Sequence, residues 1–367
     1  MKATAKLHEL GQSLWLDNIT RTMLGDGTLQ GYIDELSVTG LTSNPTIFDK
    51  AISGGDAYDQ QIAEVAAGAE AGEGIGANAQ ERIFFELALA DLRDACDLFA
   101  PVHARTAGVD GFCSLEVSPL LADDTEATIE QAAALHAKGE RDNLFIKIPG
   151  TAAGLPAIEE TIFAGIPVNV TLLFDDAQYL AAADAYMKGI ERRIEAGLDP
   201  YVASVASIFM SRWDVAVAGD VPAELKDRLG LAIGFRAYRA YNELLASDRV
   251  RRLQNEGARP QRLLWASTGT KDPEASDTLY IEGFASPFTV NTMPEETLHA
   301  FADHGQVGDL VPADGGNCEL VLKEFGDAGI DVVALAARLQ EEGKDKFAKS
   351  WEDMLGSISS QSGVAAG

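Results

Sequence analysis

The 367-residue sequence has few cysteines, few basic residues and no long apolar run, and each shortage excludes a class of protein. Cys96, Cys113 and Cys318 are widely spaced and odd in number, which excludes a disulfide framework and zinc-ligand spacing and fits a reducing cytosol. No stretch reaches the ~20 apolar residues that a membrane helix needs. The opening residues also lack the apolar core of a signal peptide. We therefore expect a cytoplasmic protein with no export signal and no membrane partner.

Basic residues are outnumbered, with 29 Lys and Arg against 57 Asp and Glu and a formal net charge of -28 at pH 7. Such a charge repels nucleic-acid phosphates, so nucleic acid is excluded as a partner. Any phosphate that the protein binds must therefore meet a local basic pocket. Nothing in the pattern decides between a monomer and a homo-oligomer, and both stay open.

What the sequence does have is an alternation of short β-branched runs with longer segments of helical period, which predicts β-α units and a parallel sheet. We predict an α/β fold, a TIM-type (β/α)8 barrel with additional helices. A doubly wound open sheet is the alternative, because strand order cannot be read from local pattern. The predicted strands are Leu14–Leu16, Leu36–Thr42, Gly111–Val117, Leu144–Ile148, Ile166–Leu172, Val202–Ala206, Leu263–Ala266 and Leu279–Ile281.

Two additions account for the length beyond the ~250 residues of a barrel. One is a helical insertion at about 47–109, with a loop over Ala66–Ala79 and a helix over Gln80–Phe99. The other is a set of C-terminal helices at about 327–356, including an amphipathic Val332–Phe347. The tail Ser357–Gly367 is expected to fray. No linker rich in Pro, Gly or Ser divides the chain, so we predict one domain over residues 1–367.

Lys147 is the main candidate for chemistry. The apolar residues Leu144, Ile146 and Ile148 alternate along its strand and should face the helices, which turns Lys147 into the barrel. Most lysines are exposed amines, but the alternation and the Pro149 that follows favour an inward position. We expect desolvation to depress the pKa of this amine and leave it free to attack a carbonyl.

Polar side chains end other predicted strands at the same edge. Asn169 and Thr171 should face inward on the strand after that of Lys147. Glu116 ends the third strand, where it suits general acid or base work, with a strand-end salt bridge as the alternative. Asp17 ends the first strand, where the alternative is a cap on the helix that begins near Asn18.

Further polar groups follow the second, sixth and seventh strands. Asn44 precedes a proline and is typical of a helix N-cap, a role that leaves amide groups for a ligand. Ser207 and Arg212 lie at and after the sixth strand, and a forked guanidinium there suits a phosphate monoester. Ser267 and Lys271 follow the seventh, where barrels often bind phosphate. A solvated surface position is the alternative for Arg212 and Lys271.

Three segments, Thr42–Thr46, Ile146–Pro149 and Asn169–Phe174, resemble the motifs of the transaldolases, specifically the longer bacterial form. The resemblance runs from near Leu14 to at least Ser267. It implies a class I Schiff-base mechanism on a single-domain barrel whose first strand is circularly shifted relative to other Schiff-base aldolases. It also implies that neither a metal nor a cofactor takes part.

The resemblance assigns a role to each matched residue. Lys147 would form an imine with a ketose phosphate, and Asp17 would take the proton of the hydroxyl whose oxygen becomes the leaving aldehyde. Glu116 and Thr171, with a bound water, would move protons while the carbinolamine forms and breaks down. The substrate-binding residues would be Asn44, Asn169, Ser207, Arg212, Ser267 and Lys271. Many shorter members carry an Arg where this chain has Gly269, and whether Lys271 replaces it stays open.

The activity implied is transfer of dihydroxyacetone from sedoheptulose 7-phosphate to glyceraldehyde 3-phosphate, giving erythrose 4-phosphate and fructose 6-phosphate. This reaction belongs to the non-oxidative pentose phosphate pathway, and its partners are small sugar phosphates. The alternatives are a fructose 6-phosphate aldolase, which releases free dihydroxyacetone, and a barrel that binds phosphosugars without turnover. The apolar ring of Phe209 beside the site favours the transferase.

Overall fold

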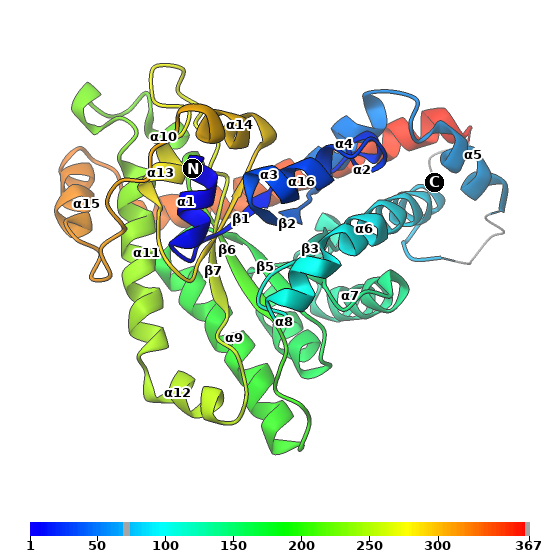
Figure 1. Ribbon diagram of the computed structural model, residues 1–367, viewed down its shortest axis with the longest axis horizontal. Coiled ribbons are helices and arrows are strands. Elements are labelled where there is room, and N and C mark those ends of the chain that lie inside the picture. Colours follow the sequence, from blue (N-terminus) through cyan, green and yellow to red (C-terminus); the bar gives the residue numbers. More distant parts are fainter. Residues whose placement is uncertain (69–73, 364–367) are drawn as a thin grey trace.

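A closed barrel of parallel strands forms the centre of this computed structural model (Figure 1). Within residues 1–68 and 74–363, the part of the chain that the structure describes, eight strands follow one another around the barrel in sequence order. The predicted TIM-type barrel is therefore confirmed, and the open doubly wound sheet is wrong. The strands are β1 (Ser13–Leu16), β2 (Val38–Thr42), β3 (Cys113–Glu116), β4 (Leu144–Pro149), β5 (Val168–Leu173), β6 (Ser204–Phe209), β7 (Arg262–Ala266) and β8 (Val290–Met293).

The last strand is not the one predicted. Leu279–Ile281 lies in helix α13 (Leu279–Gly283), whereas β8 pairs in parallel with β7 and β1. A three-residue apolar run has no period that separates a strand from a helix. The true strand was hidden because its middle residues, Asn291 and Thr292, are polar, although barrel closure buries both.

Helices connect the strands and cover the outside of the barrel. Every strand residue is buried, because one face of each strand meets the helices and the other meets the barrel interior. The covering helices are α1 (Ala3–Glu9), α2 (Arg21–Gly25), α3 (Thr28–Leu36), α7 (Thr125–Gly139), α8 (Gly154–Phe163), α9 (Asp176–Glu195), α10 (Ser211–Val217), α11 (Leu229–Leu245), α12 (Asp248–Asn255), α13, α14 (Glu295–His304) and α15 (Cys318–Asp327), with short 3-10 turns η1 (Pro119–Leu121) and η2 (Ala223–Leu225).

The expected helical insertion lies between β2 and β3. It contains α4 (Pro45–Ser53), α5 (Asp59–Gly68) and α6 (Ala79–Arg105), and α6 includes the whole helix predicted from Gln80. The predicted loop Ala66–Ala79 is wrong at its start, which belongs to α5, and at Ala79, where α6 begins, while residues 74–78 are bends as expected. Residues 69–73 of that loop lie outside the described part of the chain.

The C-terminal helix α16 (Val332–Ser362) extends from the barrel along the insertion, where it packs against α4, α5 and α6 (Figure 1). The predicted helix Val332–Phe347 is therefore confirmed. The predicted fraying from Ser357 is wrong as far as Ser362, because fully buried Ile358 belongs to the hydrophobic core and holds the last turns. Residues 364–367 lie outside the described part of the chain.

The amino-terminal end of the barrel is filled by a hydrogen-bonded polar cluster. Arg262, at the start of β7, donates to the hydroxyl of Ser13 at the start of β1 (2.5 Å). Ser13 in turn donates to Asp110, which also accepts from the indole nitrogen of Trp15 (2.7 Å). These hydrogen bonds join residues at the starts of β1 and β7 to the loop before β3, so polar side chains of the cluster fill this end of the barrel.

Candidate active site

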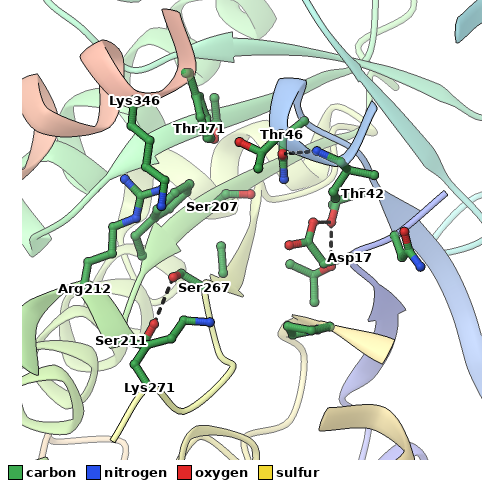
Figure 2. A pocket seen from close by; sticks show the side chains of 18 of the residues that line it. Asp17, Thr42, Thr46, Thr171, Ser207, Ser211, Arg212, Ser267, Lys271 and Lys346 are labelled. Atoms are coloured by element: carbon green, nitrogen blue, oxygen red, sulfur yellow. Dashed lines mark hydrogen bonds between the residues drawn. The ribbon is translucent and has the colours of Figure 1, made fainter. Parts of the chain in front are cut away.

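A cavity of about 850 Å³ opens at the carboxyl ends of the strands, the end where β/α barrels build their sites. Figure 2 shows side chains from several strand ends converging on it. Glu116 and Asn169 do not line its wall, but both are buried and paired in register with Lys147 on the neighbouring strands. The predicted site residues that line the cavity are Asp17, Asn44, Lys147, Thr171, Ser207, Arg212, Ser267 and Lys271. The structure thus brings together all the residues that the sequence singled out.

Lys147 points into the barrel from β4, as the alternation of apolar residues predicts. It is only 5% exposed, and its amine lines the floor of the cavity. Nζ donates to Glu116 Oε2 at 3.0 Å and to the carbonyl oxygen of Ser43 at 2.9 Å. The amine therefore has a carboxylate beside it that can accept a proton, and the side chain that carries it lines the cavity.

A polar layer surrounds the lysine inside the barrel. The hydroxyl of Ser207 donates to Asn169 Oδ1 (2.7 Å), and Asn169 Nδ2 donates to the Ser114 hydroxyl (3.1 Å). Glu116 Oε1 and the hydroxyl of Thr171 are buried without a protein partner. Buried polar atoms need partners, so each of these two atoms is available to a water or to a polar group of a ligand.

Burial raises the pKa of Glu116 above its ordinary value, and the ammonium of Lys147 opposes that rise. A carboxyl with a raised pKa is suited to passing protons near neutral pH. The alternative interpretation, a salt bridge at the strand end, is also confirmed, because Glu116 makes an ion pair (3.0 Å). Its partner is the candidate nucleophile itself.

Asp17 directly follows β1 and lines the cavity together with Lys147, whose charge acts on it. Its Oδ1 accepts from the hydroxyl of Thr42 (2.7 Å), and that hydroxyl also contacts the hydroxyl of Thr292 (2.7 Å). Since Thr42 has one hydroxyl hydrogen and gives it to Asp17, Thr292 is the donor in the second bond. Burial raises the pKa of Asp17, and the hydrogen bond from Thr42 and the charge of Lys147 oppose the rise. A buried carboxylate with a raised pKa at the edge of the cavity has the position and the acidity that a general base needs.

The two capping interpretations have different outcomes. Helix α2 starts at Arg21 with Thr20 as its N-cap, so the interpretation of Asp17 as a helix cap is wrong. Asn44 does cap α4, since its Oδ1 accepts from the backbone nitrogen of Ile47 at 3.1 Å, and it lines the cavity as well. The cap fixes the side chain while its amide nitrogen stays available to a ligand.

Arg212 forms the opposite side of the cavity from Asp17 (Figure 2). Its guanidinium lies over the rings of Phe209 (5.1 Å to the centroid) and Phe347 (5.8 Å). Among the described residues no carboxylate makes an ion pair with it, and burial lowers its pKa. An unpaired, partly buried guanidinium on aromatic rings is suited to an anionic group.

Ser267 and Lys271 complete this side. The Ser267 hydroxyl contacts that of Ser211 (3.0 Å), and both face the cavity with Arg212. A Cβ built on Gly269 would lie 3.4 Å from Lys271 Nζ. The amine of Lys271 thus lies in contact with the point at which a side chain at position 269 would begin.

Sequence reasoning missed several parts of the wall, including Lys50 of α4 and two others. Thr292 was missed because β8 itself was not recognised. The other part is contributed by α16, which lays Leu339, Glu342, Lys346 and Phe347 along the rim. Their spacing marks one helical face, but nothing local in the sequence says that this face docks on the mouth of the barrel.

No group of three or more His, Cys, Asp or Glu side chains in the described part of the chain is arranged to hold a metal ion. No helix in the same ranges is long and apolar enough to cross a membrane.

Comparisons with known proteins give one consistent result. The family model described as "Transaldolase/Fructose-6-phosphate aldolase" matches residues 14–358. A protein of Parafrankia sp. (strain EAN1pec) is 45% identical over 375 residues, covering 100% of this chain and 99% of the relative. Proteins of Arthrobacter sp. (strain FB24) and Mycobacterium tuberculosis (strain H37Rv) are 44% and 45% identical, over 97% and 96% of this chain and 96% and 95% of their own lengths. All three relatives are named transaldolase.

Proposed function

Because this chain belongs to the transaldolase/fructose-6-phosphate aldolase family, we propose that it is a transaldolase that works through an imine on Lys147. It moves dihydroxyacetone from sedoheptulose 7-phosphate to glyceraldehyde 3-phosphate, giving erythrose 4-phosphate and fructose 6-phosphate in the non-oxidative pentose phosphate pathway. One observation carries the assignment of residues. A buried lysine amine lies 3.0 Å from a carboxylate on the floor of an open cavity.

Imine formation uses the pair Lys147 and Glu116. The ammonium gives a proton to Glu116, and the free amine attacks the ketone carbon of the sugar to form a carbinolamine. Glu116 then returns a proton to the carbinolamine hydroxyl, which leaves as water while the iminium forms. The unpartnered hydroxyl of Thr171 and Glu116 Oε1 support this step, because a water held between them could carry the proton.

Carbon-carbon cleavage uses Asp17. Its carboxylate takes the proton of the hydroxyl whose oxygen becomes the leaving aldehyde, and the bonding electrons move into the iminium to give an enamine. The acceptor aldehyde then meets the enamine carbon, and Asp17 gives its proton to the new alkoxide. Water hydrolyses the resulting iminium and frees Lys147. The raised pKa of Asp17 supports both the uptake and the return of the proton, because it brings the pKa of this carboxyl closer to neutral pH.

The remaining residues hold the substrate. Asn44 and Asn169 are assigned to the hydroxyls of the dihydroxyacetone unit, and Ser207 supports it through Asn169 (2.7 Å). Arg212 and Ser267 bind the phosphate. Lys271 is assigned to that phosphate too, because its amine lies only 3.4 Å from the position that a Cβ at residue 269 would take and lines the cavity with Arg212.

A transferase must keep its enamine from being protonated by water before the acceptor arrives. The apolar rings of Phe209 and Phe347 favour this, since both line the cavity and lie about 6 Å apart (6.4 Å between centroids). A fructose 6-phosphate aldolase, the second candidate, would release free dihydroxyacetone instead. Incubation with fructose 6-phosphate alone separates them. A transferase stops after one equivalent, whereas a lyase releases dihydroxyacetone continuously.

Borohydride trapping tests the proposal directly. With fructose 6-phosphate present, reduction should attach the sugar fragment to Lys147, as peptide mass spectrometry would reveal, and should inactivate the enzyme. Lys147→Ala should neither be labelled nor turn over. A wild-type protein that stays unlabelled at this lysine, or a Lys147→Ala variant with undiminished rate, would rule out the mechanism.

Two further statements belong to the proposal. We take residues 1–367 as a single domain, supported by one hydrophobic core cluster that runs from Ala3 to Ile358. We also take the enzyme to be cytoplasmic, which fits three free, buried cysteines.

A further inference from the structure

Four cationic side chains other than Lys147 gather around the mouth of the cavity: Lys50, Arg212, Lys271 and Lys346. In the described ranges none of the four has a carboxylate oxygen within 4.0 Å, although the protein has a net charge of -28. Carboxylates of Glu295, Glu296 and Glu342 line the same cavity, yet none of them forms an ion pair with these four cations, which is unexpected in so acidic a chain. The grouping of the cations indicates an anion that the cavity is built to receive.

Lys346 differs from the other lysines of its helix. On the same α16, Lys344 forms ion pairs with Asp123 and Glu341, and Lys349 forms one with Asp353. Lys346 instead extends toward Arg212 in Figure 2. Partial burial lowers the pKa of Lys346, and the charges of Arg212, Lys271 and Lys50, in that order, lower it further. An anion placed among these groups would remove that repulsion.

The helix that carries Lys346 is fixed to the barrel close to Arg212. Gln340 donates to the carbonyl oxygens of Leu172 (2.9 Å) and Gly150 (3.2 Å) at the ends of β5 and β4. Gly343 brings the helix so near that a Cβ there would lie 3.4 Å from Arg212 Nη1. Lys346, one turn further along, is therefore held at the same end of the cavity as Arg212.

We propose that Lys346 is a specificity-determining residue that binds the phosphate of the substrate together with Arg212, so that α16 supplies one of the charges that select phosphorylated sugars. This inference rests on the proposed function for the identity of the anion. The position of Lys346 across from Asp17 fits a sugar chain that extends from the imine to the phosphate end.

Direct binding tests the inference apart from catalysis. Inorganic phosphate is titrated calorimetrically into the wild type, Lys346→Met and the control Lys349→Met, whose lysine lies on the same helix but is 76% exposed. Hydrogen bonds to charged groups contribute about 1.5–3 kcal/mol. Lys346→Met should therefore weaken phosphate binding roughly tenfold or more, and Lys349→Met should leave it unchanged. Equal affinity in all three proteins overturns the inference, whatever their activity.

Kinetics give the second measurement. With fructose 6-phosphate as donor at saturation, Lys346→Met should lower kcat/KM for glyceraldehyde 3-phosphate about tenfold but leave that for unphosphorylated glyceraldehyde unchanged. Lys346→Arg should restore the preference for the phosphorylated acceptor. An equal loss with both acceptors would show a structural role and refute the specificity role. A wild type without transferase activity would refute the proposed function, while the phosphate titration still decides the role of Lys346.

Discussion

Gly343→Ala is the sharpest test of how α16 meets the barrel. A Cβ at this position would lie 2.9 Å from Leu172 Cδ2 and 3.4 Å from Arg212 Nη1. The first distance is too short for two carbon atoms, so the end of the Leu172 side chain must move. The second requires the guanidinium to shift by a few tenths of an ångström. Gly356, in the same helix, has nothing within 4 Å of the position that a Cβ would take, and it provides the matched control.

The expected change in stability follows from two opposed effects. Replacing Gly by Ala inside an exposed helix stabilises it by about 1 kcal/mol, so Gly356→Ala should be more stable than the wild type. Gly343→Ala gains the same propensity but overpacks its contact, which costs about 1–3 kcal/mol. The free energies of unfolding of the two variants should therefore differ by roughly 1–3 kcal/mol. Urea unfolding followed by circular dichroism measures the difference.

The functional consequence lies at Arg212. Displacing the guanidinium weakens its bonds to the phosphate, so KM for fructose 6-phosphate should rise several-fold to about tenfold, with a smaller change in kcat. Gly356→Ala should keep the wild-type KM. If Gly343→Ala matched Gly356→Ala in both stability and KM, α16 would not rest on Arg212, and the reasoning about this helix would fail.

Two further predictions concern acids. Burial raises the pKa of Asp214 from 3.8 to about 6, so the folded protein keeps a proton that the unfolded chain releases, and ionisation lowers stability by about 3 kcal/mol at neutral pH. Asp214→Asn has no carboxyl group to ionise, so the urea midpoint of this variant should rise relative to that of the wild type between pH 5 and pH 7. A difference in midpoint that does not change with pH would contradict the raised pKa of Asp214. Thr42→Val removes the hydrogen bond that opposes the raised pKa of Asp17, so the acid limb of the pH–rate profile should move to higher pH. Thr42→Ser should keep the limb in place, and an unmoved limb in Thr42→Val would show that the bond does not tune the base.

The strand ends could be predicted because barrel geometry is periodic. The alternation of Leu144, Ile146 and Ile148 is enough to turn Lys147 inward, and the register of parallel neighbours brings Glu116 and Asn169 beside it. These relations depend only on the two-residue alternation of side chains along each strand and on the alignment of neighbouring parallel strands. The deep part of the candidate site therefore follows from sequence.

The rim could not be predicted because it depends on contacts between distant segments. Lys346 reaches the mouth only because α16 docks on α4 and on the end of β5, through pairs such as Thr46 and Ser350 (2.8 Å). The local sequence of α16 does not indicate which elements it packs against. Thr292 was missed for a different reason. It lies on β8, whose middle residues are polar although they are buried in the barrel, so this strand has no alternating apolar pattern that could identify it.

The position of α16 also bears on how the protein becomes active during its synthesis. A ribosome delivers the chain from the amino terminus, so all eight strands emerge before Val332, the first residue of this helix. A nascent chain with a folded barrel and the nucleophile already in place would still lack the side of the mouth that holds Lys346 and Phe347. Selection of phosphorylated sugars should therefore reach its full extent only when translation of the last helix is complete.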